Sequence, residues 1–126
     1  MEASLILMIL MVTLIGIVDV GQVLVMHQGL AERVRAGARW AVVHPYDSDR
    51  IKNVVLYNNS EAAEGAQPLL HLRREMINTA LVDSGTPEAR VVVSVDTYQF
   101  RFFTPLIAGT YTARPIKISM PVEDPY

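Results

Sequence analysis

Residues 3–18 carry no charged side chain, and the apolar run continues past a single carboxylate, Asp19, as far as Met26. About 24 residues of α-helix are roughly 36 Å long, which is enough to cross the ~30 Å hydrocarbon core of a bilayer. A buried central helix would show the same pattern, but the remaining chain is too small to surround a helix that is apolar on every side. A cleaved secretory signal would have Lys or Arg before the run and a small-residue cleavage site after it, and neither is present. The pattern therefore predicts a membrane-spanning helix.

The helical pattern then continues into an amphipathic segment that is rich in small residues. Leu30, Val34 and Trp40 fall near one face, and the charged side chains lie away from it or on its flanks. Pro45 ends the helix just before it, because the residue that precedes a proline avoids the helical region. One helix over residues 2–44 is therefore predicted, with an apolar first half and a second half that supports a small head. We expect Trp40 to anchor the head's sheet on this helix.

A short second helix and a polar loop are predicted next. Asp47 or Ser48 can cap a helix that ends at about Tyr57. Residues 58–68 have the polar composition of a loop, and residues 69–74 fit a helix or a strand equally well.

The rest of the chain alternates between apolar and polar positions, which is typical of strands. Strands are predicted over residues 75–83, 89–103 and 113–120, with a loop over residues 105–112. In the second strand one side is expected to carry Val91, Val93, Val95, Thr97 and Gln99. The predicted fold class is α+β: a long N-terminal helix and a small antiparallel meander of three strands packed on its second half.

Composition and charge mainly exclude functions. The chain of 126 residues has no cysteine, and its 11 basic and 13 acidic residues give a net charge of -2, which offers no basic surface for nucleic acid. His27, His44 and His71 are far apart, and the sequence contains no metalloprotease, nucleophile-elbow or phosphate-loop pattern. We therefore expect neither an enzyme nor a bound cofactor or metal ion.

The charges that flank the apolar run conflict with the usual membrane orientation. Nothing basic precedes the run, whereas Arg33, Arg35 and Arg39 follow it, so the positive-inside rule would keep the C-terminal part in the cytoplasm. A short basic leader that once preceded Met1 and was removed would resolve the conflict. The head would then be extracytoplasmic.

Gly16 and Gly21 lie inside the predicted membrane helix, with Asp19 between them. Each glycine weakens a helix by about 1 kcal/mol relative to alanine. Two interpretations stay open: close packing against a neighbouring helix, or a segment that unwinds and stretches when the helix leaves lipid for a protein bundle. A carboxylate within an apolar span is costly. Asp19 therefore lies near the interface or pairs with an arginine or the backbone of a neighbour.

Several motifs occur in a specific order along the chain. They are Met1-Glu2-Ala3-Ser4-Leu5, Gly16-Ile17-Val18-Asp19-Val20-Gly21, Ala36-Gly37-Ala38-Arg39, and the strand Val93–Phe100 before Pro105-Leu106. With a glutamate at the start of a long apolar helix and a small sheet after it, the chain resembles type IV pilins. The closest resemblance is to the TadE-like pseudopilins of tight-adherence pili. The chain departs from the pilin pattern in one respect, since the glutamate is usually the fifth mature residue and here it is the second.

The resemblance implies a structural subunit of an adhesive, Tad-type filament that assembles through its apolar helix. Glu2 would then set the register between subunits by pairing with the N-terminal amine of its neighbour, which would offset the cost of burying its charge. The implied partners are copies of the same chain, other pilins and pseudopilins, the inner-membrane assembly platform and prepilin peptidase. The protein would reside in the bacterial inner membrane before assembly and in a cell-surface filament afterwards.

On this interpretation residues 1–26 form a transmembrane or filament-core helix. Residues 27–126 form the head, which includes the amphipathic half of the helix to about residue 44. Two alternatives fit the same sequence: a minor pseudopilin that primes or regulates assembly in the inner membrane, and an unrelated single-pass protein with a small binding head.

Overall fold

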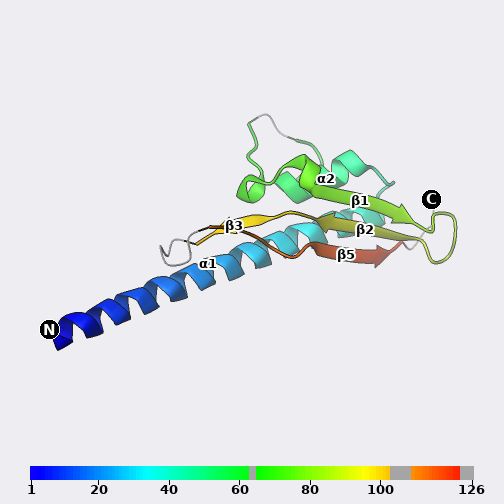
Figure 1. Cartoon of the computed structure of the whole chain (residues 1–126). Helices are drawn as coiled ribbons and strands as arrows, with labels where there is room; N and C mark the ends of the chain where they lie inside the picture. Colours follow the sequence, from blue (N-terminus) through cyan, green and yellow to red (C-terminus); the bar gives the residue numbers. More distant parts are fainter. Residues whose placement is uncertain (63–64, 103–108, 123–126) are drawn as a thin grey trace.

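The computed structural model of the chain describes residues 1–62, 65–102 and 109–122. Two helices, α1 (Glu2–Val43) and α2 (Ser48–Tyr57), are followed by two short 3₁₀ turns at Leu69–His71 and Arg74–Met76. The strands are β1 (Ile77–Val82), β2 (Arg90–Val95), β3 (Gln99–Arg101), β4 (Thr110–Thr112) and β5 (Ile116–Pro121). The α+β prediction is confirmed: a long N-terminal helix carries a small antiparallel sheet (Figure 1).

The single long helix is confirmed, and it ends at Val43, just before the predicted boundary. The N-terminal half of α1 projects away from the rest of the molecule. The second half is covered by α2 and the sheet (Figure 1). The buried positions of the second half recur every three or four residues, as expected for one face of a helix; they are Leu30, Val34, Gly37, Ala38 and Ala41.

The capped second helix is confirmed as well. The Asp47 carboxylate accepts hydrogen bonds from the backbone N–H groups of Asp49 and Arg50, at 3.0 and 3.2 Å. The helix ends at Asn58, which has a left-handed backbone conformation (φ 59°) and whose N–H donates to the carbonyl of Val54. The inner face of α2 buries Ile51, Val54, Val55 and Leu56.

The three-stranded sheet has the order β1-β2-β5, and both pairs are antiparallel. The central strand β2 buries Val91, Val93 and Val95 against the helices, as the alternation predicted. Both helices lie on this one face of the sheet, so the head has two layers (Figure 1). The core formed between the layers joins α1, α2 and β2 through Val34, Ile51 and Val93, all fully buried.

The predicted strand over residues 89–103 is wrong in one respect, because it is broken after Val95. Thr97 adopts a left-handed conformation (φ 57°), and the ladder resumes only at Gln99. The pairs Val95–Ile116 and Gln99–Thr112 keep the same register, with residues 96–98 opposite residues 113–115. The break therefore twists the ribbon without shifting its pairing, and Pro115 contributes to it because proline lacks the N–H that a ladder needs.

The twist reverses which side chains of the ribbon point toward the core. Thr97 and Gln99, expected on the side of the buried valines, are exposed, and Tyr98 is buried in their place. The predicted loop over residues 105–112 is also partly wrong, since Thr110–Thr112 pairs with β3 as β4. The predicted strand end at residue 103 and the Pro105-Leu106 motif lie outside the described residues.

Candidate functional site

The candidate functional site is the N-terminal half of α1, whose apolar side chains are exposed. The large exposed hydrophobic residues of this segment are Leu5, Ile6, Leu7, Met8, Ile9, Leu10, Met11, Val12, Leu14, Ile15, Ile17, Val18, Val20, Leu24 and Val25. In the described part of the chain, α1 is the one helix long and apolar enough to cross a membrane, and only 6% of its most apolar window is buried. A surface of this size requires lipid or other apolar helices around it.

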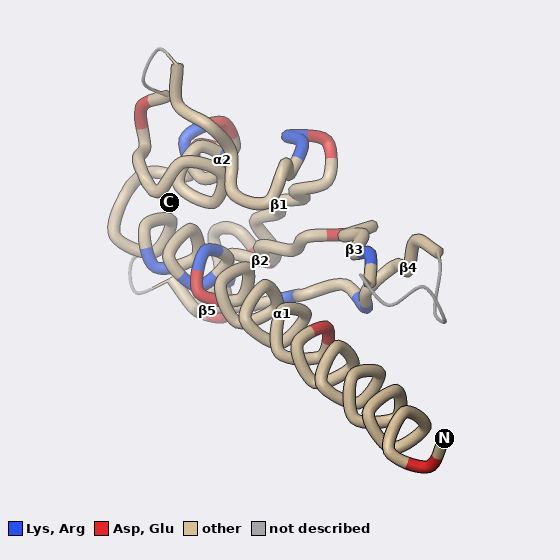
Figure 2. The backbone as a smooth tube through the Cα atoms, turned by 90° about the vertical axis from the view of Figure 1, so that its left-hand side faces the viewer, with Lys and Arg blue, Asp and Glu red and all other residues tan. Residues whose placement is uncertain are grey.

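Glu2 lies in the first turn of α1, at the end farthest from the head (Figure 2). The positive end of the helix dipole favours a carboxylate there by about 0.3–1 kcal/mol. Asp19 is the next acidic residue along the helix, and no Lys or Arg occurs before Arg33. Glu2 is therefore separated from the next charged side chain, Asp19, by an apolar stretch of the helix. Its role in register stays a prediction.

Asp19 is only 3% exposed, although both of its sequence neighbours, Val18 and Val20, are more than half exposed. It lies on the same helix face as Met26 and Leu30, which pack against the head, and it has an interaction partner within the chain. Contacts with the rest of the chain therefore extend along α1 as far as Asp19. The carboxylate is shielded from lipid by its own chain, which reduces the cost of its position. Pairing of Asp19 with a neighbouring subunit stays a prediction.

Gly16 and Gly21 are not required by packing within the chain. A Cβ atom added to either glycine would have no heavy atom within 4 Å. Both lie in continuous helix, and Gly21 contributes to a shallow surface depression with Val18, Gln22 and Val25. The open space above them suits the close approach of another helix. Stretching of this segment stays a prediction.

Trp40 is half-buried at the C-terminal end of α1 and packs against the edge of the core. Its ring stacks on His44, with centroids 4.4 Å apart and planes 5° apart. It also lines a hollow with Pro45 and Tyr46, so these contacts are with the connection between α1 and α2. Anchoring of the sheet by this residue stays a prediction.

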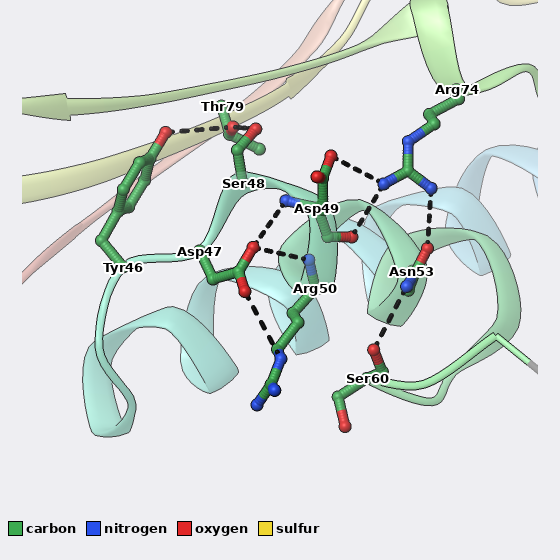
Figure 3. Close-up of polar contacts among 9 residues, drawn as sticks. All are labelled: Tyr46, Asp47, Ser48, Asp49, Arg50, Asn53, Ser60, Arg74 and Thr79. Carbon is green, nitrogen blue, oxygen red and sulfur yellow. Dashed lines mark hydrogen bonds and ion pairs between the residues drawn. The ribbon is translucent and has the colours of Figure 1, made fainter.

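A polar network that the sequence did not predict joins α2 to β1 and to the turn before it (Figure 3). Thr79 of β1 accepts a hydrogen bond from the Tyr46 hydroxyl (3.1 Å) and shares one with Ser48 (2.7 Å). Arg74 donates to the carboxylate of Asp49 (2.8 Å) and to the side-chain carbonyl of Asn53 (2.9 Å). This network fixes α2 on the sheet. The hydrogen bond and the positive charge of Arg74 lower the pKa of Asp49 below its usual value.

An exposed apolar half-helix joined to a small α+β head is an architecture that suits a membrane anchor. The family model described as TadE-like protein matches residues 1–39 of the chain. No curated protein and no solved structure matches the chain. The family match confirms the predicted resemblance to TadE-like pseudopilins over residues 1–39. The match supports a Tad pilus-associated, membrane-anchored pseudopilin.

Proposed function

We propose that this protein is a structural subunit of a Tad-type pilus-like filament and that it assembles through the N-terminal half of α1. The observation that carries the proposal is the exposure of that half: between Leu5 and Val18 every large side chain is apolar and exposed, and the hydroxyl of Thr13 donates a hydrogen bond to the carbonyl of Ile9 in the helix itself. The head leaves this segment free to move from lipid into a bundle of identical helices. The role is structural and needs no catalytic group.

Close packing would drive this transfer, because lipid tails are as apolar as the helix surface and the hydrophobic effect favours neither state. Small residues at the contact allow helix backbones to approach, and Gly16 and Gly21 lie on the uncovered half of α1 with open space above them. Glu2 supplies the polar part of the contact. Once desolvated in a bundle, its carboxylate requires a positive partner, and pairing with the N-terminal amine of an adjacent subunit would fix the axial register.

The test compares two variants of Glu2 with a matched control on the same helix. Glu2→Gln keeps the shape but removes the charge, so insertion into the membrane should persist while filament yield falls. Glu2→Leu should insert at least as well and fail to polymerise. Glu32→Gln makes the same chemical change at an exposed position beside the head and should leave filament yield unchanged.

Membrane-bound and sheared extracellular protein would be measured by immunoblot, with electron microscopy of the sheared fraction. Wild-type filament yield from both Glu2 variants would reject the register role. Absence of filaments from the unmutated protein, expressed normally with its assembly machinery, would instead favour a minor pseudopilin or an anchored binding module.

A further inference from the structure

Among the described residues of the head, the two strands of the β3–β4 hairpin (Gln99–Arg101 and Thr110–Thr112) reach farthest toward the exposed half of α1. It extends beyond the three-stranded sheet in the direction of the N-terminus (Figure 1, Figure 2). Phe100 and Arg101 of β3 line a groove of about 560 Å³ together with Gln22 and Met26 of α1. The hairpin therefore lies beside α1 at the level of these two helix residues.

At the same level, the opposite side of α1 is apolar and uncovered. Val20 and Leu24 are each 56% exposed and Val25 is 69% exposed, whereas Asp19 faces the head and is buried. A bilayer that covers these side chains extends from residue 3 to Val25, a span of roughly 34 Å, slightly more than the ~30 Å hydrocarbon core. The hairpin then lies at the depth of the membrane surface on the side of the head.

The composition of the hairpin suits that depth. Phe100, Phe102 and Tyr111 form one aromatic cluster, with ring centroids 5.3 to 5.9 Å apart, and Tyr111 is 39% exposed. Arg101 is the only charged side chain within residues 97–102 and 109–113, which are the described part of the hairpin and its flanks. It is exposed. Aromatic rings are enriched at the boundary between hydrocarbon and water, and arginine interacts favourably with lipid phosphates.

We infer that the β3–β4 hairpin inserts its aromatic cluster into the headgroup region of the membrane that α1 crosses, with Tyr111 in contact with lipid and Arg101 near the phosphates. This inference rests on the proposed membrane insertion of α1. The hairpin gives the subunit a second membrane contact beside the helix. Two contacts fix the tilt of the helix and the rotation of the head about the helix axis. Every subunit in the membrane then presents the same face to its neighbours before assembly.

The absence of cysteine from the chain allows each position to be spin-labelled without background mutations. The full chain would be reconstituted in vesicles of phosphatidylethanolamine and phosphatidylglycerol, with single cysteines at Leu10, Thr110 or Val82. Thr110 lies in β4 beside Tyr111, and Val82 lies at the end of β1 away from the N-terminus (Figure 1). Electron paramagnetic resonance would measure the collision of each label with oxygen and with a water-soluble nickel complex.

We expect the label at Leu10 to collide with oxygen only, the label at Val82 to collide freely with the nickel complex, and the label at Thr110 to lose most of its nickel collisions. Tyr111→Ser should restore them at Thr110. Val82→Ser, which truncates a side chain that is equally exposed (39%), should not. Circular dichroism of each variant would establish that the head is folded.

The outcomes distinguish a failure of the hairpin contact from a failure of the membrane insertion of α1 on which the inference rests. A Thr110 label as open to nickel as the Val82 label, with Leu10 in lipid, overturns the hairpin contact and leaves the membrane span intact. Nickel access at Leu10 rejects the span itself. Shielding of Thr110 that disappears when the protein is diluted with lipid would assign the hairpin to contacts between subunits and also overturn the inference.

Discussion

Gly37 of α1 lies so close to Val55 of α2 that a Cβ atom added to the glycine would be 2.6 Å from Cγ2 of the valine. The same Cβ would be 3.6 Å from the backbone carbonyl oxygen of Ile51, so α2 crosses α1 at this point. Gly37 therefore has a different function from Gly16 and Gly21, which face open space. One long helix carries two kinds of glycine: one fixes the head, and the others are available for contacts with other molecules.

We predict that Gly37→Ala destabilises the head. Overpacking of a tight contact costs about 1–3 kcal/mol, and the stiff, fully buried Val55 against Gly37 favours the upper part of this range, above the gain of about 1 kcal/mol in helix propensity. Unfolding in urea of the full chain in mild detergent, followed by the fluorescence of Trp40, would measure the change in the free energy of unfolding. The control is Gly29→Ala, which changes another glycine of α1 that has nothing within 4 Å and should be neutral or slightly stabilising. Equal stability of the two variants would contradict the tight crossing.

A second prediction concerns the ion pair between Arg74 and Asp49. Because the pKa of Asp49 is lower in the folded state, this pair stabilises the head above the unfolded pKa of about 3.9. The contribution is lost as the pH falls through the folded-state pKa. Arg74→Gln should therefore raise the pKa of Asp49 toward its usual value. Carbon-detected NMR titration of the Asp49 carboxyl group would measure it.

The control for this titration is Arg50→Gln. Arg50 pairs with Asp47 at 3.4 Å, so its loss should leave the pKa of Asp49 almost unchanged. An Asp49 titration that shifts equally in both variants would show that general positive charge, rather than the contact with Arg74, lowers the pKa.

The parts of this fold that could be predicted are those with local signals. The apolar run, Pro45 and the Asp47 cap each act within a few residues, so the bounds of α1 and α2 were predicted closely. The break at Thr97 could not be predicted, because a left-handed threonine is uncommon and the alternation of side chains continues through it.

The candidate site was likewise predicted where it depends on the helix alone. The uncovered apolar surface and the position of Glu2 follow from α1. Burial of Asp19 depends on how far the head reaches back along the helix, and the contacts of Thr79 and Arg74 join residues 21 to 33 positions apart. Such relationships are fixed by tertiary packing and leave no periodic pattern in the sequence.

A third prediction concerns the hydroxyl group of Tyr98, which is buried and has no hydrogen-bond partner among the described residues. Burial raises the pKa of this phenol, because the charged form is desolvated. The unfolded chain therefore ionises first, and stability that is present below pH ~10 is lost as the pH rises toward the folded-state pKa. Tyr98→Phe should remove this loss and stabilise the head by about 1 kcal/mol at neutral pH, because an unpaired polar group no longer has to be buried.

Urea unfolding at pH 7 and at alkaline pH would test the Tyr98 variant. Tyr111→Phe is the matched control, since its hydroxyl belongs to an exposed side chain and should change stability little. Destabilisation by Tyr98→Phe at neutral pH would mean that the hydroxyl has a favourable contact in solution.

The last prediction separates assembly from folding at Gly21. Replacement by isoleucine places a branched side chain on the open surface of α1, where its Cβ atom has no heavy atom of the rest of the chain within 4 Å. The head should therefore keep its free energy of unfolding, while helices in a filament could no longer approach closely at this point. Filament yield should fall, and the amount of protein in the membrane should not. Val20→Ile is the matched control, because Val20 is already a branched, exposed residue next to the glycine. Sheared protein, membrane-bound protein and the urea midpoint would be measured for both variants. If Gly21→Ile polymerised as well as Val20→Ile, the glycines would have no part in the helix contact, and assembly would have to depend on Glu2 and the remaining apolar surface.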